Sequence, residues 1–147
     1  MVCTNCVFVC VCSFGSLNLT PIKLDATLKT SFTAAFRPQS KQQLQAAVDE
    51  CVKLSPIGDC SKGPHGAIGE WDVSGVTEMR EIFSRASRFN QDLSKWDVSS
   101  VTDMASMFKG LKAFDQDLSK WDVSVVTNMR ELFLEASAFN QDLSKWD

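Results

Sequence analysis

Four tryptophans recur at a constant interval of 25 residues, and this interval constrains the fold more than any other feature of the chain. Trp71, Trp96, Trp121 and Trp146 are the only tryptophans in the sequence. Three methionines and six phenylalanines keep the same register: Met79, Met104, Met129, Phe83, Phe108, Phe133, Phe89, Phe114 and Phe139. Residues 71–145 therefore form three complete repeats, and Trp146 and Asp147 begin a fourth. A fixed period of this size is the signature of a repeat architecture.

One 25-residue repeat is too short to bury its own apolar side chains, so each repeat is expected to bury them against its neighbours. The recurring tryptophans, methionines and phenylalanines are the predicted core of the stack. Because these residues have structural positions, the bias of the aromatic residues towards Phe and Trp, with no Tyr, does not indicate a cofactor pocket.

Two hydrophobic periods lie within each repeat. Apolar and polar residues alternate from Leu93 to Val98, which is typical of a strand. From Val101 to Phe114 the apolar residues recur every three or four positions, and Thr102 would cap the resulting helix. The sequence therefore predicts an α/β repeat solenoid, with short parallel strands stacked on one side and short helices on the other.

The run from Phe89 to Phe108, FNQDLSKWDVSSVTDMASMF, resembles the signature of BspA-like leucine-rich-repeat surface proteins, a mycoplasma-type and algal group with a 25-residue unit. The resemblance covers residues 68–147, with 36–67 leading into the array. It implies a leucine-rich-repeat-like fold, a secreted or cell-surface location, and a role in adhesion or protein interaction.

An N-terminal cap is predicted over residues 40–70. Ser40 and Gln43 form a capping-box pattern, apolar residues follow at helical spacing, and Pro56 ends the pattern. We expect a helix at about 41–54 that covers the first repeat. The alternative is an ordinary surface helix on another core.

Cys51 and Cys60 lie close enough in sequence to close a small loop within this cap. The surface location implied by the resemblance favours a disulfide, which would restrain the cap. A buried free thiol at Cys51 with an exposed Cys60 is the competing interpretation.

Residues 1–20 form an apolar, cysteine-rich leader without Lys or Arg, and residues 21–39 have the composition of a linker. The leader is interpreted as a degraded signal peptide or as a mispredicted gene start. It is too short to span a bilayer, so no transmembrane segment is expected. Cys3 and Cys6 lack the partner ligands of a zinc site.

Catalytic, cofactor and metal sites are not expected. His65 is the only histidine and tyrosine is absent, which leaves few candidates for a catalytic base. The net charge of −3 argues against a nucleic-acid partner. The column of aspartates could bind calcium, but one carboxylate per repeat does not by itself converge on an ion.

The leading interpretation is a noncatalytic binding module for an unknown protein or cell-surface glycan. Its predicted binding surface is the strand face that carries Lys95, Asp97, Lys120, Asp122 and Lys145. The repeats differ mainly elsewhere, on the predicted helical side. A structural spacer from a longer array and a calcium- or glycan-binding solenoid are the alternatives. An uncapped C-terminal end would also permit self-association.

Overall fold

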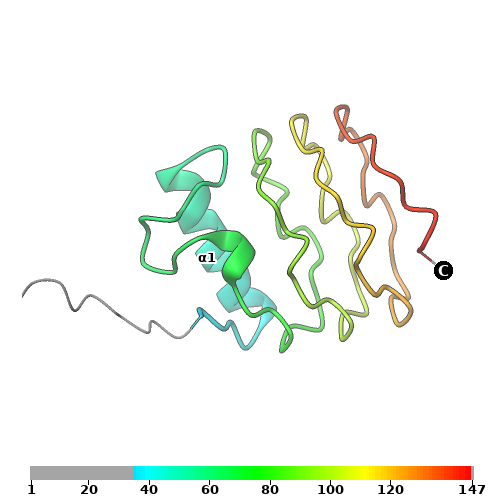
Figure 1. Ribbon diagram of the computed structural model, residues 1–147, viewed down its shortest axis with the longest axis horizontal. Coiled ribbons are helices and arrows are strands. Elements are labelled where there is room, and N and C mark those ends of the chain that lie inside the picture. Colours follow the sequence, from blue (N-terminus) through cyan, green and yellow to red (C-terminus); the bar gives the residue numbers. More distant parts are fainter. Residues whose placement is uncertain (1–34, 147) are drawn as a thin grey trace, which may run out of the picture. The chain divides into compact units, whose positions relative to one another are not determined.

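The computed structural model describes residues 35–146, and the predicted leader and most of the linker lie outside this range. The described residues belong to one compact unit, Thr33–Asp147. They contain a helix, α1 (Lys41–Leu54), and a short 3-10 helix, η1 (Ile68–Glu70). Figure 1 shows α1 followed by three similar coils that lie side by side. We call residues 71–95, 96–120 and 121–145 coil 1, coil 2 and coil 3.

The predicted leucine-rich-repeat-like α/β solenoid is wrong. Within residues 35–146 the coils contain no helix and no strand longer than an isolated bridge. The parallel pairing between coils is limited to two isolated bridges, Glu78 with Asp103 and Asp103 with Asn128. The coils therefore stack without a sheet on one side or helices on the other.

The segment predicted as a helix instead forms hydrogen bonds to the next coil. The main-chain N–H groups of Met104, Ser106 and Phe108 donate to carbonyl oxygens of coil 3 at 2.9–3.0 Å. Ser106 has a φ of 55°, a left-handed conformation that interrupts an α-helix. Thr102 donates its N–H to the Thr77 carbonyl and does not cap a helix. Successive tight turns, such as that from Met104 to Met107, account for the apolar spacing.

The segment predicted as a strand consists of turns. The Trp96 N–H donates to the Leu93 carbonyl at 3.0 Å, and Val101 donates to Val98 at 2.9 Å. A hydrogen bond from residue i+3 to residue i closes a four-residue β-turn, which reverses the chain. Alternating burial here comes from consecutive turns and not from an extended strand.

The core consists of columns of identical side chains. Phe83, Phe108 and Phe133 stack with centroid separations of 5.7 and 5.3 Å and interplanar angles of 7°. Nine of the predicted core residues are buried: Trp71, Trp96, Trp121, Met79, Met104, Phe83, Phe108, Phe89 and Phe114. The other four are partly buried and all lie at the C-terminal end: Met129, Phe133, Phe139 and Trp146.

Helix α1 covers the first coil, and it begins and ends at the residues that the capping pattern and Pro56 predict. The Ser40 hydroxyl accepts from the Gln43 N–H at 3.3 Å. The helix buries one face, formed by Leu44, Ala47, Val48 and Cys51, in the same core as coil 1.

Side chains and carbonyls of the cap replace contacts that a preceding coil would make. The Gln45 side-chain amide donates to the Ile82 carbonyl at 3.0 Å. In coil 2 the equivalent carbonyl, that of Met107, accepts a main-chain N–H from coil 1. The Ile68 carbonyl accepts the Trp96 indole N–H at 2.9 Å, as Leu93 does for Trp121 at 3.1 Å. The cap therefore offers coil 1 part of the hydrogen-bonding surface of a coil.

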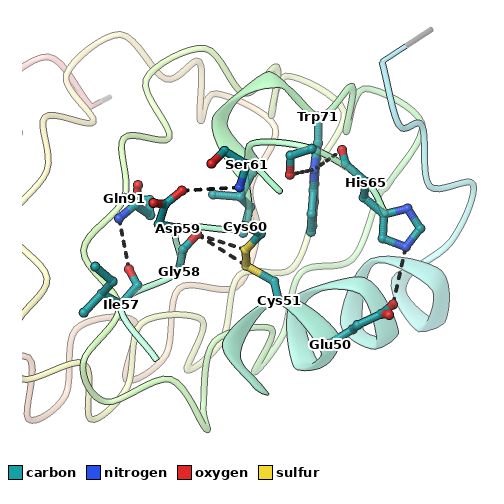
Figure 2. Close-up of a disulfide and its surroundings, with 12 residues drawn as sticks. Glu50, Cys51, Ile57, Gly58, Asp59, Cys60, Ser61, His65, Trp71 and Gln91 are labelled. Atoms are coloured by element: carbon teal, nitrogen blue, oxygen red, sulfur yellow. Dashed lines mark hydrogen bonds and ion pairs between the residues drawn. A yellow bond between two sulfur atoms is a disulfide. The ribbon is translucent and has the colours of Figure 1, made fainter. Parts of the chain in front are cut away.

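A disulfide between Cys51 and Cys60 joins α1 to the loop at 55–67, as Figure 2 shows, with the Cα atoms 5.3 Å apart. The Ile57 carbonyl in this loop accepts from the Gln91 side chain at 3.1 Å. The neighbouring Gly58 has a φ of 86°, and a Cβ there would overlap the Phe89 ring. The disulfide ties the loop to α1, and the contacts of Ile57 and Gly58 hold the loop against coil 1.

Candidate functional site

The predicted binding surface is partly occupied by contacts within the fold. Lys95 pairs with Glu70 at 2.5 Å, and this hydrogen bond raises the pKa of Lys95. Glu70 lies 25 residues before Lys95, so it occupies the first position of the lysine column. Lys120 and Lys145 are exposed and continue the column through coils 2 and 3.

Asp97 and Asp122 on this predicted surface close turns. Each accepts from the N–H and the hydroxyl of the serine two residues later, with distances of 3.1 and 2.7 Å in both coils. The bond from the Ser124 hydroxyl is the main cause of the lowered pKa of Asp122. An aspartate that bonds its own backbone two residues on forms an Asx turn. Both carboxylates therefore accept hydrogen bonds within their own turns.

A second aspartate in each repeat has the same role. Asp92, Asp117 and Asp142 accept main-chain N–H bonds from Ser94, Ser119 and Ser144 at 2.8–2.9 Å. These bonds are the largest cause of the lowered pKa of each carboxyl group. The recurring Asp-x-Ser motif is thus a turn-forming element.

Polar side chains also connect the coils. The Asn90 Oδ1 atom accepts from the Asp115 N–H at 3.0 Å and from the Gln116 side chain at 2.8 Å. Asp115 repeats the arrangement with Asn140 at 2.9 Å and with Gln141 at 2.8 Å. This column has a structural role, as its uniform spacing suggests.

A groove crosses all three coils and combines charged side chains with small ones. We call it the cross-coil groove, and its lining residues are Arg80, Glu81, Ser84, Ala105, Ser106, Lys109, Asn128, Arg130 and Glu131. Ser84, Ala105 and Ser106 leave room between the longer charged side chains. The groove is open, so its walls can contact a partner without rearrangement of the core.

Ion pairs border the cross-coil groove. Lys109 of coil 2 meets Glu131 of coil 3 at 2.8 Å, a contact that raises the pKa of Lys109 and lowers that of Glu131. Arg80 pairs with Glu81 at 3.2 Å, and Arg130 with Glu131 at 3.5 Å. The Arg130 side chain is 82% exposed. Exposed pairs of this kind contribute little to stability, so they can be exchanged for contacts with a partner.

Sequence reasoning placed the binding surface on the lysine and aspartate columns and missed this groove. A signal was present, because the repeats differ at groove positions: Arg80, Ala105 and Arg130 form one column, and Ser84, Lys109 and Leu134 form another. The columns that form the Asp-x-Ser turns and the stacked aromatic rings stay constant, whereas the four columns that line the groove vary, as do two buried columns, Ile82/Met107/Leu132 and Ala86/Leu111/Ala136.

His65 lies in the cap, away from the groove lining. Its ring contacts that of Phe36 with the centroids 3.9 Å apart and the planes tilted by 33°, and its Nε2 atom is 3.7 Å from Glu50. The His65 carbonyl accepts the Trp71 indole N–H at 3.0 Å (Figure 2). Through these contacts His65 helps to hold Trp71, the first residue of coil 1, in place. Within residues 35–146, no three His, Cys, Asp or Glu side chains are placed to hold a metal ion.

A family model described as a Mycoplasma protein of unknown function, DUF285, matches residues 55–147. The chain belongs to this family. The DUF285 match includes the cap loop and all three coils, whereas α1 precedes it. Searches of curated proteins and of solved structures found no match.

No helix in the described part of this DUF285 chain is long and apolar enough to cross a membrane.

Proposed function

We propose that this chain is a noncatalytic binding module that holds a protein partner in the cross-coil groove. The proposal rests on a difference between constant and varying positions of the repeat. The constant aspartates, serines and Asn/Gln pairs close turns or join coils. Four of the columns that vary between repeats contribute side chains to the groove, namely those that contain Arg80, Glu81, Ser84 and Asn128. Several positions at which the repeats differ are therefore gathered on one surface.

The groove favours a partner segment of mixed charge. Arg80, Lys109 and Arg130 offer positive groups, and Glu81 and Glu131 offer negative ones, across a lining that includes small residues. Complementary charges at an exposed surface contribute mainly to specificity and association rate. A polypeptide with alternating charges meets both signs, whereas a uniformly anionic polymer would meet the glutamates.

The resemblance to BspA-like surface proteins supports a secreted or cell-surface location as part of this proposal. The Cys51–Cys60 disulfide is in keeping with an oxidising compartment. The proposal does not depend on the leucine-rich-repeat architecture that the resemblance implied. It needs only the stacked coils and the exposed groove.

Selection of peptides from a random display library on the whole chain tests the proposal. The discriminating variant is R80A/R130A, because coil 2 already has Ala105 at this position and the fold tolerates it. We expect to select peptides of mixed charge that bind the chain saturably. This binding should be lost in R80A/R130A. The matched control, K95A/K120A, should retain binding.

Two results would contradict the proposal. One is a set of binders that loses affinity in K95A/K120A and keeps it in R80A/R130A. The other is a hydrolase activity of the purified chain that a single aspartate substitution abolishes.

A further inference from the structure

We infer that the cross-coil groove binds an extended partner segment with the charge order acidic-x-basic-x-acidic, where x is a residue on the opposite face of the segment. This inference rests on the proposed function and deepens it, because it assigns the order and the spacing of the partner's charges. The two acidic side chains bind Arg80 and Arg130. The basic side chain lies over Ala105, between Glu81 and Glu131, which all line the groove.

An Arg-Glu pair occurs as a unit in two of the three coils. Coils 1 and 3 have Arg80 with Glu81 and Arg130 with Glu131, whereas coil 2 has Ala105 with Ser106. Each arginine approaches its glutamate through Nε, at 3.2 Å in coil 1 and 3.5 Å in coil 3. Among residues 35–146, the Nη atoms of these two arginines donate no hydrogen bond. The Nη atoms of each guanidinium can therefore bind a carboxylate in a bidentate arrangement.

This pair of columns faces sideways from the stack, so its exposure does not depend on where the stack ends. The Arg80 and Glu81 side chains are 57% and 51% exposed although coil 2 follows them. Contact with the following coil is made by the main chain, because the Glu81 N–H donates to the Ala105 carbonyl at 3.0 Å. The side chains therefore stay accessible to a partner in a stack of any length.

The two glutamates are not explained by the backbone at their positions. Glu81, Ser106 and Glu131 all adopt the left-handed conformation, with φ of 61°, 55° and 56°. Glycine or asparagine adopts this conformation at lower cost than glutamate. Ser106 shows that the column does not need a carboxylate to stack. We assign the two carboxylates to orientation of the arginines and to attraction of the partner's basic side chain.

The charges that line the groove add up to one surplus positive charge. Arg80, Lys109 and Arg130 are positive, and Glu81 and Glu131 are negative. Lys109 bonds Glu131 at 2.8 Å, so these two charges compensate each other. A segment with two acidic residues and one basic residue neutralises the surplus. The reverse order would bring positive side chains against the arginines, and such like-charge contacts exclude wrong partners.

The separation of the coils fits alternate residues of an extended chain. The stacked rings of Phe83, Phe108 and Phe133 are 5.7 and 5.3 Å apart from coil to coil. Residues i and i+2 of a strand share a face and lie roughly 6.5–7 Å apart. Three alternate residues therefore reach coils 1, 2 and 3 in turn, and the long charged side chains take up the difference. In a helical segment, opposite charges one turn apart would pair with each other instead.

Titration of the isotope-labelled whole chain with the peptide TETKTET, followed by the main-chain amide signals, tests the inference. Threonine is used as the spacer because it favours an extended chain. We expect saturable shifts centred on Arg80, Ala105 and Arg130 at low ionic strength, since salt screens exposed charges. The peptide TEETKTT has the same composition without the spacing and should bind several-fold more weakly. TKTETKT, with the charges reversed, should not bind detectably.

Two double variants test the assigned roles. R80K/R130K keeps both charges but loses the planar fork, so the affinity for TETKTET should fall about two- to fivefold. E81Q/E131Q should remove the preference for TETKTET over TETTTET that the unaltered chain shows. Neither variant should change the melting temperature, because exposed pairs contribute little to stability. The matched control is E135Q, since Glu135 is also left-handed, with a φ of 62°, but does not line the groove. It should keep the lysine preference.

Four results would overturn the inference: absence of saturable shifts with TETKTET, equal affinity for TEETKTT, equal affinity for TKTETKT, or an unchanged lysine preference in E81Q/E131Q. If peptides selected from the library still bind the unaltered chain and fail to bind R80A/R130A, the proposed function stands and only the charge order is wrong. If binding of every peptide is unaffected by R80A/R130A, the proposed function fails as well.

Discussion

The two ends of the coil stack have the same repeat sequence but different surroundings. At the N-terminal end Met79, Phe83 and Phe89 have no exposed surface, because α1 and the cap loop cover them. At the C-terminal end Phe133 and its neighbours in coil 3 are only partly buried. The comparison shows that burial in this fold is set by the neighbouring coil or cap and not by the repeat's own sequence.

The cap covers its end with chemistry that differs from that of a coil. It uses a helix face, one glutamine side chain, loop carbonyls and a disulfide where a coil would use its main chain. Each of these groups can be altered singly, whereas the coil contacts are mostly main chain. The following predictions use this difference, from the largest expected effect to the smallest.

Removal of equivalent rings should affect the two ends unequally. F83A leaves a cavity in a fully buried column, and we expect it to lower the free energy of unfolding by about 3–5 kcal/mol. F133A removes a partly buried ring, and we expect about 1–2 kcal/mol, because less apolar surface returns to water. Urea denaturation of both variants measures the difference. Equal losses would contradict the account of burial by neighbours.

Loss of the disulfide should leave the N-terminal end of the coil stack less well covered, as the C-terminal end is. The bridge joins residues nine apart, and closure of so short a loop contributes about 2–3 kcal/mol. We expect C51A/C60A to unfold at a correspondingly lower urea concentration. Coil 1 should lose protection from hydrogen exchange more than coil 3, and uniform loss in all three coils would argue against a local role for the cap.

Removal of the glutamine side chain that replaces a coil contact should have a smaller effect on stability. Q45A leaves the Ile82 carbonyl without its side-chain donor, and we expect a loss of about 1 kcal/mol in thermal or urea unfolding. Gln42, exposed on the same helix, provides the matched control. A Q42A variant as unstable as Q45A would show that the effect comes from the helix and not from the contact with coil 1.

Acid should weaken all coils alike, because the Asp-x-Ser turns recur at both ends. Hydrogen bonds lower the pKa of Asp92, Asp117 and Asp142 in the folded state, below the unfolded value of 3.8. Their stabilisation is therefore fully present above that value and is lost as the pH falls through the lower folded-state pKa.

Urea unfolding between pH 2.5 and about 7 measures this dependence. The triple variant D92N/D117N/D142N retains an acceptor oxygen, as Asn128 does for the Arg130 N–H, but it cannot titrate. Its stability should change less below pH 4 than that of the unaltered chain. Equal slopes would exclude these carboxyl groups as the source of the acid sensitivity.

The repeat register, the core columns and the bounds of the cap helix could be predicted from the sequence, because each rests on a local or periodic pattern. The secondary structure of the repeat could not. Apolar residues three or four apart, from Met104 to Phe114, fit a helix and a series of tight turns equally well. The choice depends on bonds from Met104, Ser106 and Phe108 to a coil 25 residues away. No local sequence pattern identifies these hydrogen-bond partners.

The sequence-based prediction did not include the cross-coil groove for a related reason. The binding surface was predicted at constant charged residues such as Lys95 and Asp97. In the structure Lys95 forms an ion pair and Asp97 closes an Asx turn. Arg80 and Arg130 vary with Ala105 in their column and line the groove. In this chain the constant Asp-x-Ser positions close turns, whereas the columns that line the groove differ between repeats.

Residue-resolved amide hydrogen exchange of the whole chain tests the stacked-coil account most directly. We predict slow exchange for the N–H groups that donate to a following coil: Met79, Glu81, Phe83, Met104, Ser106 and Phe108. Met129, Glu131 and Phe133 at the equivalent positions of coil 3 should exchange fast. Equal protection of the three coils at these positions, or a continuous protected run typical of a helix from 102 to 111, would contradict the account.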